Sequence, residues 1–259
     1  MSDVEKTDDL VLLELSNGIA TITLNRPERL NAVNVEMFTK FIAVLRAIGD
    51  DSDIGIVVLT GAGTSFCTGK DLKGESRSSW SASQKMQASR LTFSVVPLMR
   101  EIPQPIIAAV RGHAVGAGFA LAAASDMRVV APDAQFNPVF TKIGMTPGDL
   151  GLSWLLPRII GAGRAAQVFY RAEVIDAETA LDWGLVNEIS EDPFARARGI
   201  AEELGRGSAE SLRQTKELLS ASWATASLRD HTALELHSQV ICGDSAEHAA
   251  AMEAFKTRK

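Results

Sequence analysis

The amino-acid sequence predicts an α/β protein with a mostly parallel sheet, followed by a helical C-terminal region. Two observations carry this fold class. The first half of the chain runs strand, strand, helix and then twice strand, helix, an order typical of parallel strands joined by helices. Past residue 197 the apolar residues recur almost wholly at helical spacing. No linker separates the two parts, so we divide the chain only by this change of character, into residues 1–196 and 197–259.

The N-terminal elements follow from local patterns. The segments VLLEL (11–15) and IATITL (19–24) flank Asn17-Gly18, which predicts a β-hairpin. Residues 34–51 place their apolar side chains on one helical face, and IGIVVLTG (54–61) reads as a buried strand.

The later elements follow in the same way. A long polar loop leads to a helix predicted over about 81–100 and then to the strand PIIAAV (105–110). A glycine-rich loop with its own helix comes next, and MRVVAP (127–132) forms another strand. From about residue 154 the pattern becomes helical. We expect the amphipathic C-terminal segments to pack on the protein's own core or on a sister subunit.

Composition excludes several classes of protein. The chain has 259 residues, a net charge of -6 and 46% hydrophobic residues, which suits one large globular unit. Its scattered lysines and arginines argue against a nucleic-acid surface. Cys67 and Cys242 lack metal-ligand spacing, so we expect a reducing, cytoplasmic setting and no metal site. No apolar run is long enough to span a bilayer, so we expect no membrane insertion.

Two glycine-rich loops are the strongest functional signal. They are TGAGTSFCTGKDLKG (60–74) and GHAVGAG (112–118). The first is no phosphate loop of the Walker type, because Thr64 stands at its first glycine position, and Phe66 occupies the third glycine position of a dinucleotide motif. Two backbone amides that converge from separate loops would instead form an oxyanion hole.

At this point the sequence resembles the crotonase, or enoyl-CoA hydratase/isomerase, superfamily. The similarity lies in LNRPERLNAVN (24–34), SFCTGKDLKG (65–74), residues 105–136, residues 144–161 and AETALDWGLVNEI (177–189). It implies a crotonase-like spiral of ββα units over residues 1–196 with an acyl-CoA site, and a helical C-terminal trimerisation region over residues 197–259. It also implies a homotrimer or hexamer. The ligand would be an acyl-CoA thioester, with coenzyme A as part of the substrate and no further cofactor.

The resemblance also assigns residues. The thioester oxygen would be held by the amides of Lys70 and Ala117. Backbone at Lys70, Asp71 and Leu72 would hold the adenine, Lys73 would lie near the CoA phosphates, and Arg29 to Ala32 would follow the pantetheine. A neighbouring subunit would bring Phe255 and Lys256 or Lys259 to the adenine.

The two glutamates of a resembling hydratase are absent, since Ala120 and Phe140 stand at their positions. Asp149 remains, at a place where related isomerases carry a proton-shuttling carboxylate. Its apolar neighbours Met145, Leu150, Leu152 and Trp154 would raise its pKa if they bury it. A structural alternative is that Asp149 caps a helix beginning near Leu150.

Three functions follow from these residues. Double-bond isomerisation with Asp149 as the proton carrier leads, hydration by water activated at Asp149 comes second, and a non-catalytic acyl-CoA binder is the alternative outside enzymes. Asn137 is a further candidate for contacting substrate or water, His113 is expected to pack, and nothing in the sequence activates Cys67. Residues 74–92, with Trp80, Met86 and Leu91, are expected to border the acyl pocket.

Overall fold

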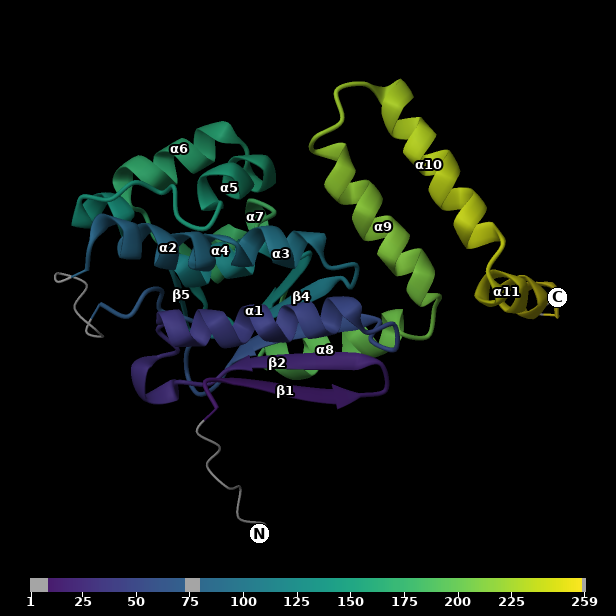
Figure 1. Ribbon diagram of the computed structural model, residues 1–259, viewed down its shortest axis with the longest axis horizontal. Coiled ribbons are helices and arrows are strands. Elements are labelled where there is room, and N and C mark those ends of the chain that lie inside the picture. Colours follow the sequence, from purple (N-terminus) through teal and green to yellow (C-terminus); the bar gives the residue numbers. More distant parts are fainter. Residues whose placement is uncertain (1–8, 73–79, 258–259) are drawn as a thin grey trace, which may run out of the picture.

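The computed structural model describes residues 9–72 and 80–257, and its centre is a six-stranded sheet in the order β1-β2-β3-β4-β6-β9 (Figure 1). In this described part, β1 pairs antiparallel with β2, and each following pair in the sheet is parallel. The predicted α/β class with mostly parallel pairing is therefore confirmed. The strands are β1 (Val11–Ser16), β2 (Ile19–Leu24), β3 (Ile56–Gly61), β4 (Ile106–Val110), β5 (His113–Val115), β6 (Met127–Val130), β7 (Gln135–Asn137), β8 (Ile175–Asp176) and β9 (Glu188–Ile189).

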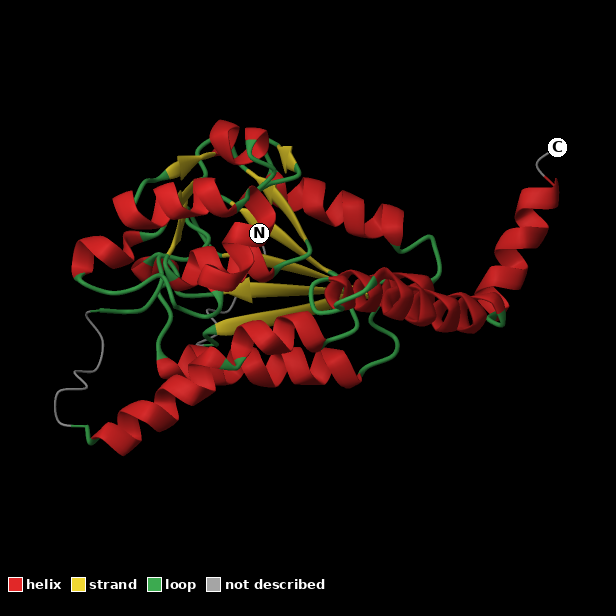
Figure 2. Cartoon of the chain, turned by 90° about the horizontal axis from the view of Figure 1, so that it is seen from above, coloured by secondary structure: helices red, strands yellow, loops and turns green. Residues whose placement is uncertain are grey.

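Helices cover both faces of this sheet (Figure 2). The α-helices are α1 (Val35–Asp50), α2 (Ala82–Phe93), α3 (Val95–Glu101), α4 (Ala117–Ala124), α5 (Leu152–Ile160), α6 (Ala162–Arg171), α7 (Ala177–Asp182), α8 (Pro193–Leu204), α9 (Ala209–Ser222), α10 (Leu228–Gly243) and α11 (Ala246–Thr257). Among the described residues, the 3₁₀ helix η1 (Pro27–Arg29) precedes α1 and η3 (Val139–Ile143) lies between α4 and α5. No helix within the described residues has both the length and the apolar character that crossing a bilayer requires.

The sheet separates two hydrophobic clusters because successive strand residues point to opposite faces. In β3, Val57 and Leu59 join the large cluster, to which α1 contributes all six of its buried side chains. Ile56 and Val58 point the other way and pack with α8. The Asn34 side chain caps α1 by accepting a hydrogen bond from the Met37 amide at 2.8 Å.

The prediction of one helix over residues 81–100 was wrong, because two helices, α2 and α3, meet at Ser94. Pro97 lies in the first turn of α3 and has no N–H to donate to the Phe93 carbonyl four residues earlier. A continuous helix would leave that bond unmade. The break places Phe93 at the end of α2, which matters for the site.

A second, small sheet carries the glycine-rich loop. Its order is β5-β7-β8, with β5 and β7 parallel and β7 and β8 antiparallel. These strands have two or three residues each, too few to show an alternating pattern, and sequence patterns did not predict them.

The C-terminal helices leave the body of the molecule (Figure 1). Residue 197, where the sequence changes character, lies inside α8, and α8 packs on β3, β4 and β6. Helices α9 and α10 then form a neighbouring pair, and α11 lies at the far end.

A buried ionic cluster ties α9 to the body. The Lys216 ammonium donates to the carbonyls of Met99 at 2.9 Å and Gln104 at 2.7 Å, and it lies 3.3 Å from Asp126. Asp126 also accepts from Arg100 at 2.7 Å and from the Ile106 amide at 2.8 Å. Burial lowers the pKa of Lys216 to about 8.

The Lys216 pKa predicts how stability depends on pH. From about pH 8 to about 10.5 the unfolded chain keeps a proton that the folded chain has lost. Loss of the Lys216 proton therefore raises the free energy of unfolding as the pH rises through this window. Below the window Lys216 is protonated in both states, and its buried charge destabilises the folded state by the full amount. We expect the free energy of unfolding of the wild type, relative to Lys216→Met, to rise with pH across the window in urea titrations.

Lys85→Met is the control, since Lys85 is an exposed lysine of α2. The free energy of unfolding of this variant should keep a constant offset from the wild type. A Lys216→Met offset that stayed constant or fell with pH would contradict the assignment.

Candidate active site

Two loops that are far apart in sequence pair through their backbones. The Cys67 amide donates to the His113 carbonyl at 3.0 Å, and the Val115 amide donates to the Cys67 carbonyl at 2.9 Å. The Phe66 amide donates to the Arg111 carbonyl at 2.8 Å. The loop around Cys67 thereby lies along β5, next to the start of α4.

Glycine makes this approach possible at two positions. A Cβ at Gly118 would lie 2.1 Å from the Cys67 carbonyl oxygen, closer than any real contact. Gly69 has a φ of +86°, and a Cβ there would lie 2.7 Å from the Val115 carbonyl oxygen and 3.5 Å from the Ala117 nitrogen. The amide of Lys70, which follows Gly69, therefore lies beside the amide of Ala117.

Both of these amides are open donors within the described part of the chain. Val33 and Lys70 pair as an isolated parallel β-bridge. In this bridge the Val33 amide donates to the Gly69 carbonyl and the Asp71 amide donates to the Val33 carbonyl. The Lys70 N–H is left without an acceptor there. Ala117 is the first residue of α4, where N–H groups have no partner within the helix. Sequence reasoning placed these two residues together, and the fold does bring them together.

Arg128 holds the other end of α4. Its guanidinium donates to the carbonyls of Ala122 at 3.3 Å and Ser125, and its Nε donates to the Leu185 carbonyl at 2.5 Å. Burial lowers the pKa of Arg128 to about 10, so it stays protonated at neutral pH. A cation at the C-terminal carbonyls favours the helix dipole and fixes the axis on which Ala117 sits.

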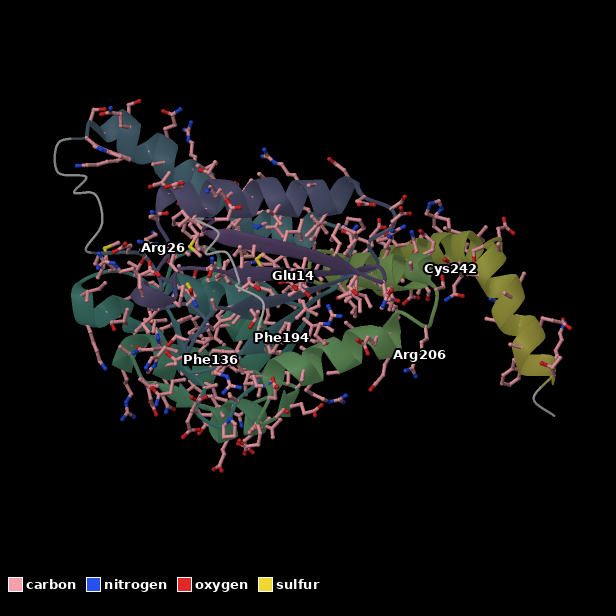
Figure 3. The ribbon with its side chains drawn as sticks, turned by 90° about the horizontal axis from the view of Figure 1, so that it is seen from below. Glu14, Arg26, Phe136, Phe194, Arg206 and Cys242 are labelled. Atoms are coloured by element: carbon pink, nitrogen blue, oxygen red, sulfur yellow. The ribbon has the colours of Figure 1, made fainter. Side chains whose placement is uncertain are left out.

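The residues predicted to hold CoA surround the same loop. Arg26 pairs with Asp71 at 3.0 Å and donates to the Ala32 carbonyl at 2.6 Å. The Thr68 amide donates to the Leu30 carbonyl at 3.1 Å, so Arg29 to Ala32 lie along the loop. Leu72 is 83% exposed, and Lys73 lies outside the described residues. Figure 3 shows Arg26 at the opposite end of the molecule from Cys242 of α10.

Strained backbone concentrates around this site. Leu30, Asn31 and Leu150 have φ values of 50°, 56° and 49°. A residue with a side chain seldom adopts this left-handed conformation, which costs of order 1–3 kcal/mol at each position. Asn31 is held in it by three bonds, because its side chain accepts from the Arg26 amide and donates to the carbonyls of Ala62 and Ser65.

Asp149 lies at this site, paired with the side chain of Lys70. Lys70 Nζ donates to Asp149 Oδ1 at 3.0 Å, and the two side chains are 40% and 11% exposed. Asp149 Oδ2 accepts no hydrogen bond from the described residues. Sequence reasoning assigned the Lys70 amide and the Asp149 carboxylate separately and missed their ion pair, for which residues 79 apart give no local signal.

The alternative role of Asp149 as a helix cap is wrong. Helix α5 begins at Leu152 rather than near Leu150, its N-cap is Gly151, and no side chain caps it. The Asp149 backbone carbonyl accepts from the Leu152 amide at 3.0 Å, which leaves the carboxylate free for Lys70.

The two positions of the absent glutamates are apolar and buried. Ala120 is fully buried in α4. Phe140 is buried too, and its ring lies 3.7 Å from where a Cβ of Gly116 would be. Neither side chain can donate or accept a proton beside the two amides.

The three remaining candidates lie in different environments. The Asn137 carbonyl accepts from the Gly116 amide, while its buried Oδ1 has no donor among the described residues. His113 is exposed on β5 and does not pack in the core. Burial raises the pKa of Cys67 to about 12, so it supplies no thiolate.

Of the residues predicted to border the acyl pocket, some line a pocket and others do not. Trp80 and Leu91 line a pocket together with Val35, whereas Met86 is exposed elsewhere on α2. Residues 74–79 of that segment lie outside the described residues. Within the described chain, no three His, Cys, Asp or Glu side chains are arranged to hold a metal ion.

Comparison with known proteins identifies the family and the fold. The family model described as enoyl-CoA hydratase/isomerase matches residues 14–259. The chain is 32% identical over 97% of both chains to 1,2-epoxyphenylacetyl-CoA isomerase of Escherichia coli K12. Its fold is similar to those of an enoyl-CoA hydratase from Bacillus anthracis, at 27% identity, and an enoyl-CoA hydratase/isomerase from Cupriavidus metallidurans CH34, at 32% identity.

The TM-scores to these two structures are 0.91 and 0.88, with coverage of 97% of this chain in both cases and of 97% and 94% of those chains. The resemblance to the crotonase superfamily and the crotonase-like fold class are thereby confirmed. This chain belongs to the enoyl-CoA hydratase/isomerase family of enzymes.

Proposed function

We propose that this enzyme moves a double bond within an acyl-CoA thioester, with Asp149 as the single proton carrier. The observation that carries the proposal is the ion pair of Lys70 with Asp149. Lys70 supplies an open backbone amide, and its side-chain ammonium binds the Asp149 carboxylate. The thioester oxygen would accept from the amides of Lys70 and Ala117. Enolate charge that develops there would be stabilised by both donors.

Isomerisation needs one carboxylate where hydration by the family's paired glutamates needs two. Asp149 Oδ2 would take a proton from the carbon next to the thioester, the electron pair would move to the thioester oxygen, and the same proton would return to a carbon further along. The apolar side chains of Ala120 and Phe140 leave no second group for adding water. Names of relatives include both isomerases and hydratases, so they do not choose between the reactions.

We also propose the contacts of the coenzyme. The adenine would lie against the backbone at Asp71 and Leu72, the phosphates near Lys73 and the pantetheine along Arg29 to Ala32. The Arg26–Asp71 ion pair supports this proposal because it fixes the loop to that segment. Exposed apolar side chains on the outlying helices α10 and α11, among them Leu228, Leu236 and Phe255, support assembly as a homotrimer or hexamer.

Asp149→Asn tests the proton carrier. An amide of the same shape cannot take the proton, so we expect conversion of 3-enoyl-CoA to 2-enoyl-CoA to fall by about 10²- to 10⁴-fold. Deuterium uptake from D2O at the carbon next to the thioester should be lost with it. NMR and absorbance assays on both isomers would measure the two effects.

Asp182→Asn is the matched control, because Asp182 is an exposed carboxylate at the end of α7. If the wild type instead adds water to 2-enoyl-CoA, the reaction is hydration and the isomerase proposal is wrong. If both proteins bind the thioesters tightly but exchange no deuterium, the protein is an acyl-CoA binder and not an enzyme of this reaction.

Lys70→Met tests whether the ammonium positions Asp149. The variant keeps its backbone amide, so we expect KM to stay near that of the wild type while kcat falls by about 10- to 100-fold as the carboxylate loses its orientation. Lys70→Arg should restore most of kcat because it can still pair with Asp149. Lys40→Met serves as control, since Lys40 pairs with Asp9 and Glu36 on the surface. Unchanged kcat in Lys70→Met would remove the positioning role.

Gly118→Ala tests the approach of the two loops. The added methyl group meets the Cys67 carbonyl and must push the loop and α4 apart, which separates the two amides. We expect kcat to fall by about 100-fold, because small displacements of oxyanion donors are costly. Gly163→Ala is a matched control at the second residue of α6, where a Cβ meets nothing within 4 Å. Wild-type turnover in Gly118→Ala would contradict this reading of the oxyanion hole.

A further inference from the structure

A cavity of about 540 Å³ lies between α3, α5 and the end of α9, and two of its lining residues lie close to the Lys70–Asp149 pair in space or in sequence. Phe93 lines the cavity and also lies under the Lys70 ammonium, which is 5.3 Å from the centre of its ring. Gly151, two residues after Asp149, lines the cavity as well. The cavity is therefore adjacent to the Lys70–Asp149 pair, on which the proposed function depends.

Aromatic rings from three separate elements face this cavity. They are Phe93 at the end of α2, Trp154 in α5 and Trp223 directly after α9. The rings of Trp154 and Trp223 are 5.1 Å apart and tilted by 55°. Phe93 and Trp154 are still 40% and 44% exposed, so ring surface remains available to a ligand.

Cations hold the two tryptophan rings in place. The guanidinium of Arg158 lies 4.0 Å from the centre of the Trp154 ring, and that of Arg100 lies 5.2 Å from the centre of the Trp223 ring. Fixed rings offer contact area without losing much side-chain freedom on binding. A planar aromatic group gains edge-to-face or offset contacts from such a wall, and a flexible chain gains only area.

The charges at the cavity disfavour an anionic acyl group. Arg100 borders the cavity, but its guanidinium already binds Asp126 at 2.7 Å and Ser220 at 2.9 Å. Glu101, which also borders the cavity, is exposed and would repel a carboxylate. The cavity therefore suits an uncharged group.

We infer that this enzyme takes acyl-CoA thioesters that carry an uncharged aromatic ring, and that Trp154 and Trp223 recognise this ring. The inference rests on the proposed function, because it places the acyl group of that substrate. It identifies a class of substrate and two residues that determine specificity for it.

Calorimetric titration with saturated thioesters tests this inference without turnover. The probes are 3-phenylpropanoyl-CoA, nonanoyl-CoA, which has the same number of acyl carbons, and CoA itself. We expect the aromatic thioester to bind about tenfold more tightly than the linear one. Trp154→Leu should bring this ratio towards one and leave the affinity for CoA unchanged. Trp223→Leu provides a second, independent variant should the first not fold.

Trp183→Leu is the matched control, because Trp183 also lies against an arginine, Arg164, but does not line the cavity. The ratio of its affinities for the aromatic and the linear thioester should equal that of the wild type. Equal or tighter binding of nonanoyl-CoA, or a ratio unchanged in both variants, would overturn the inference and leave the isomerase proposal standing. A retained aromatic preference without any isomerisation would overturn the isomerase proposal alone, and failure of every thioester to bind would overturn both.

Discussion

The approach of Gly118 to the Cys67 carbonyl holds the candidate site together. Because Gly118 has no side chain, the backbone of α4 can lie directly against the Cys67 carbonyl. The hydrogen bonds of Cys67 with β5 can then form, and the Lys70 amide comes to lie beside that of Ala117. Arg128 fixes the far end of α4 through backbone carbonyls. The donors are thus set by packed backbone and need no reorganisation when negative charge develops on a bound oxygen, which is the condition for effective electrostatic catalysis.

Lys70 links that backbone site to the only proton carrier we assign. Its amide is one of the two oxyanion donors we propose and its side chain binds Asp149, so a shift of the loop would affect the donor and the carboxylate together. Family membership is consistent with an acyl-CoA substrate but leaves the reaction open, because the reaction we propose depends on which carboxylates surround the two amides. Here the apolar residues Ala120 and Phe140 take those places, and one aspartate approaches from the segment before α5.

Helix α9 takes part in the same arrangement. Its Lys216 is buried against Met99, Gln104 and Asp126, and Arg100 of that cluster reaches Ser220 and the ring of Trp223. A buried charge is costly unless it is paired, so this cluster specifies one position for α9. The end of α9 thereby becomes a wall of the aromatic cavity, although the sequence shows it only as the start of a helical tail.

Local sequence determined the hairpin at Asn17-Gly18, helix α1 with its Asn34 cap, the parallel strands of the main sheet and the two glycine-rich loops. Each depends on hydrogen bonds or an apolar period within one segment, which neighbouring residues encode. The break between α2 and α3 was missed, although Pro97 is a local signal for it. The Lys70–Asp149 pair, the meeting of Phe93, Trp154 and Trp223, and the burial of Lys216 join residues distant in the chain. Only the tertiary structure decided these, because such contacts depend on how the segments pack and leave no periodic trace in the sequence.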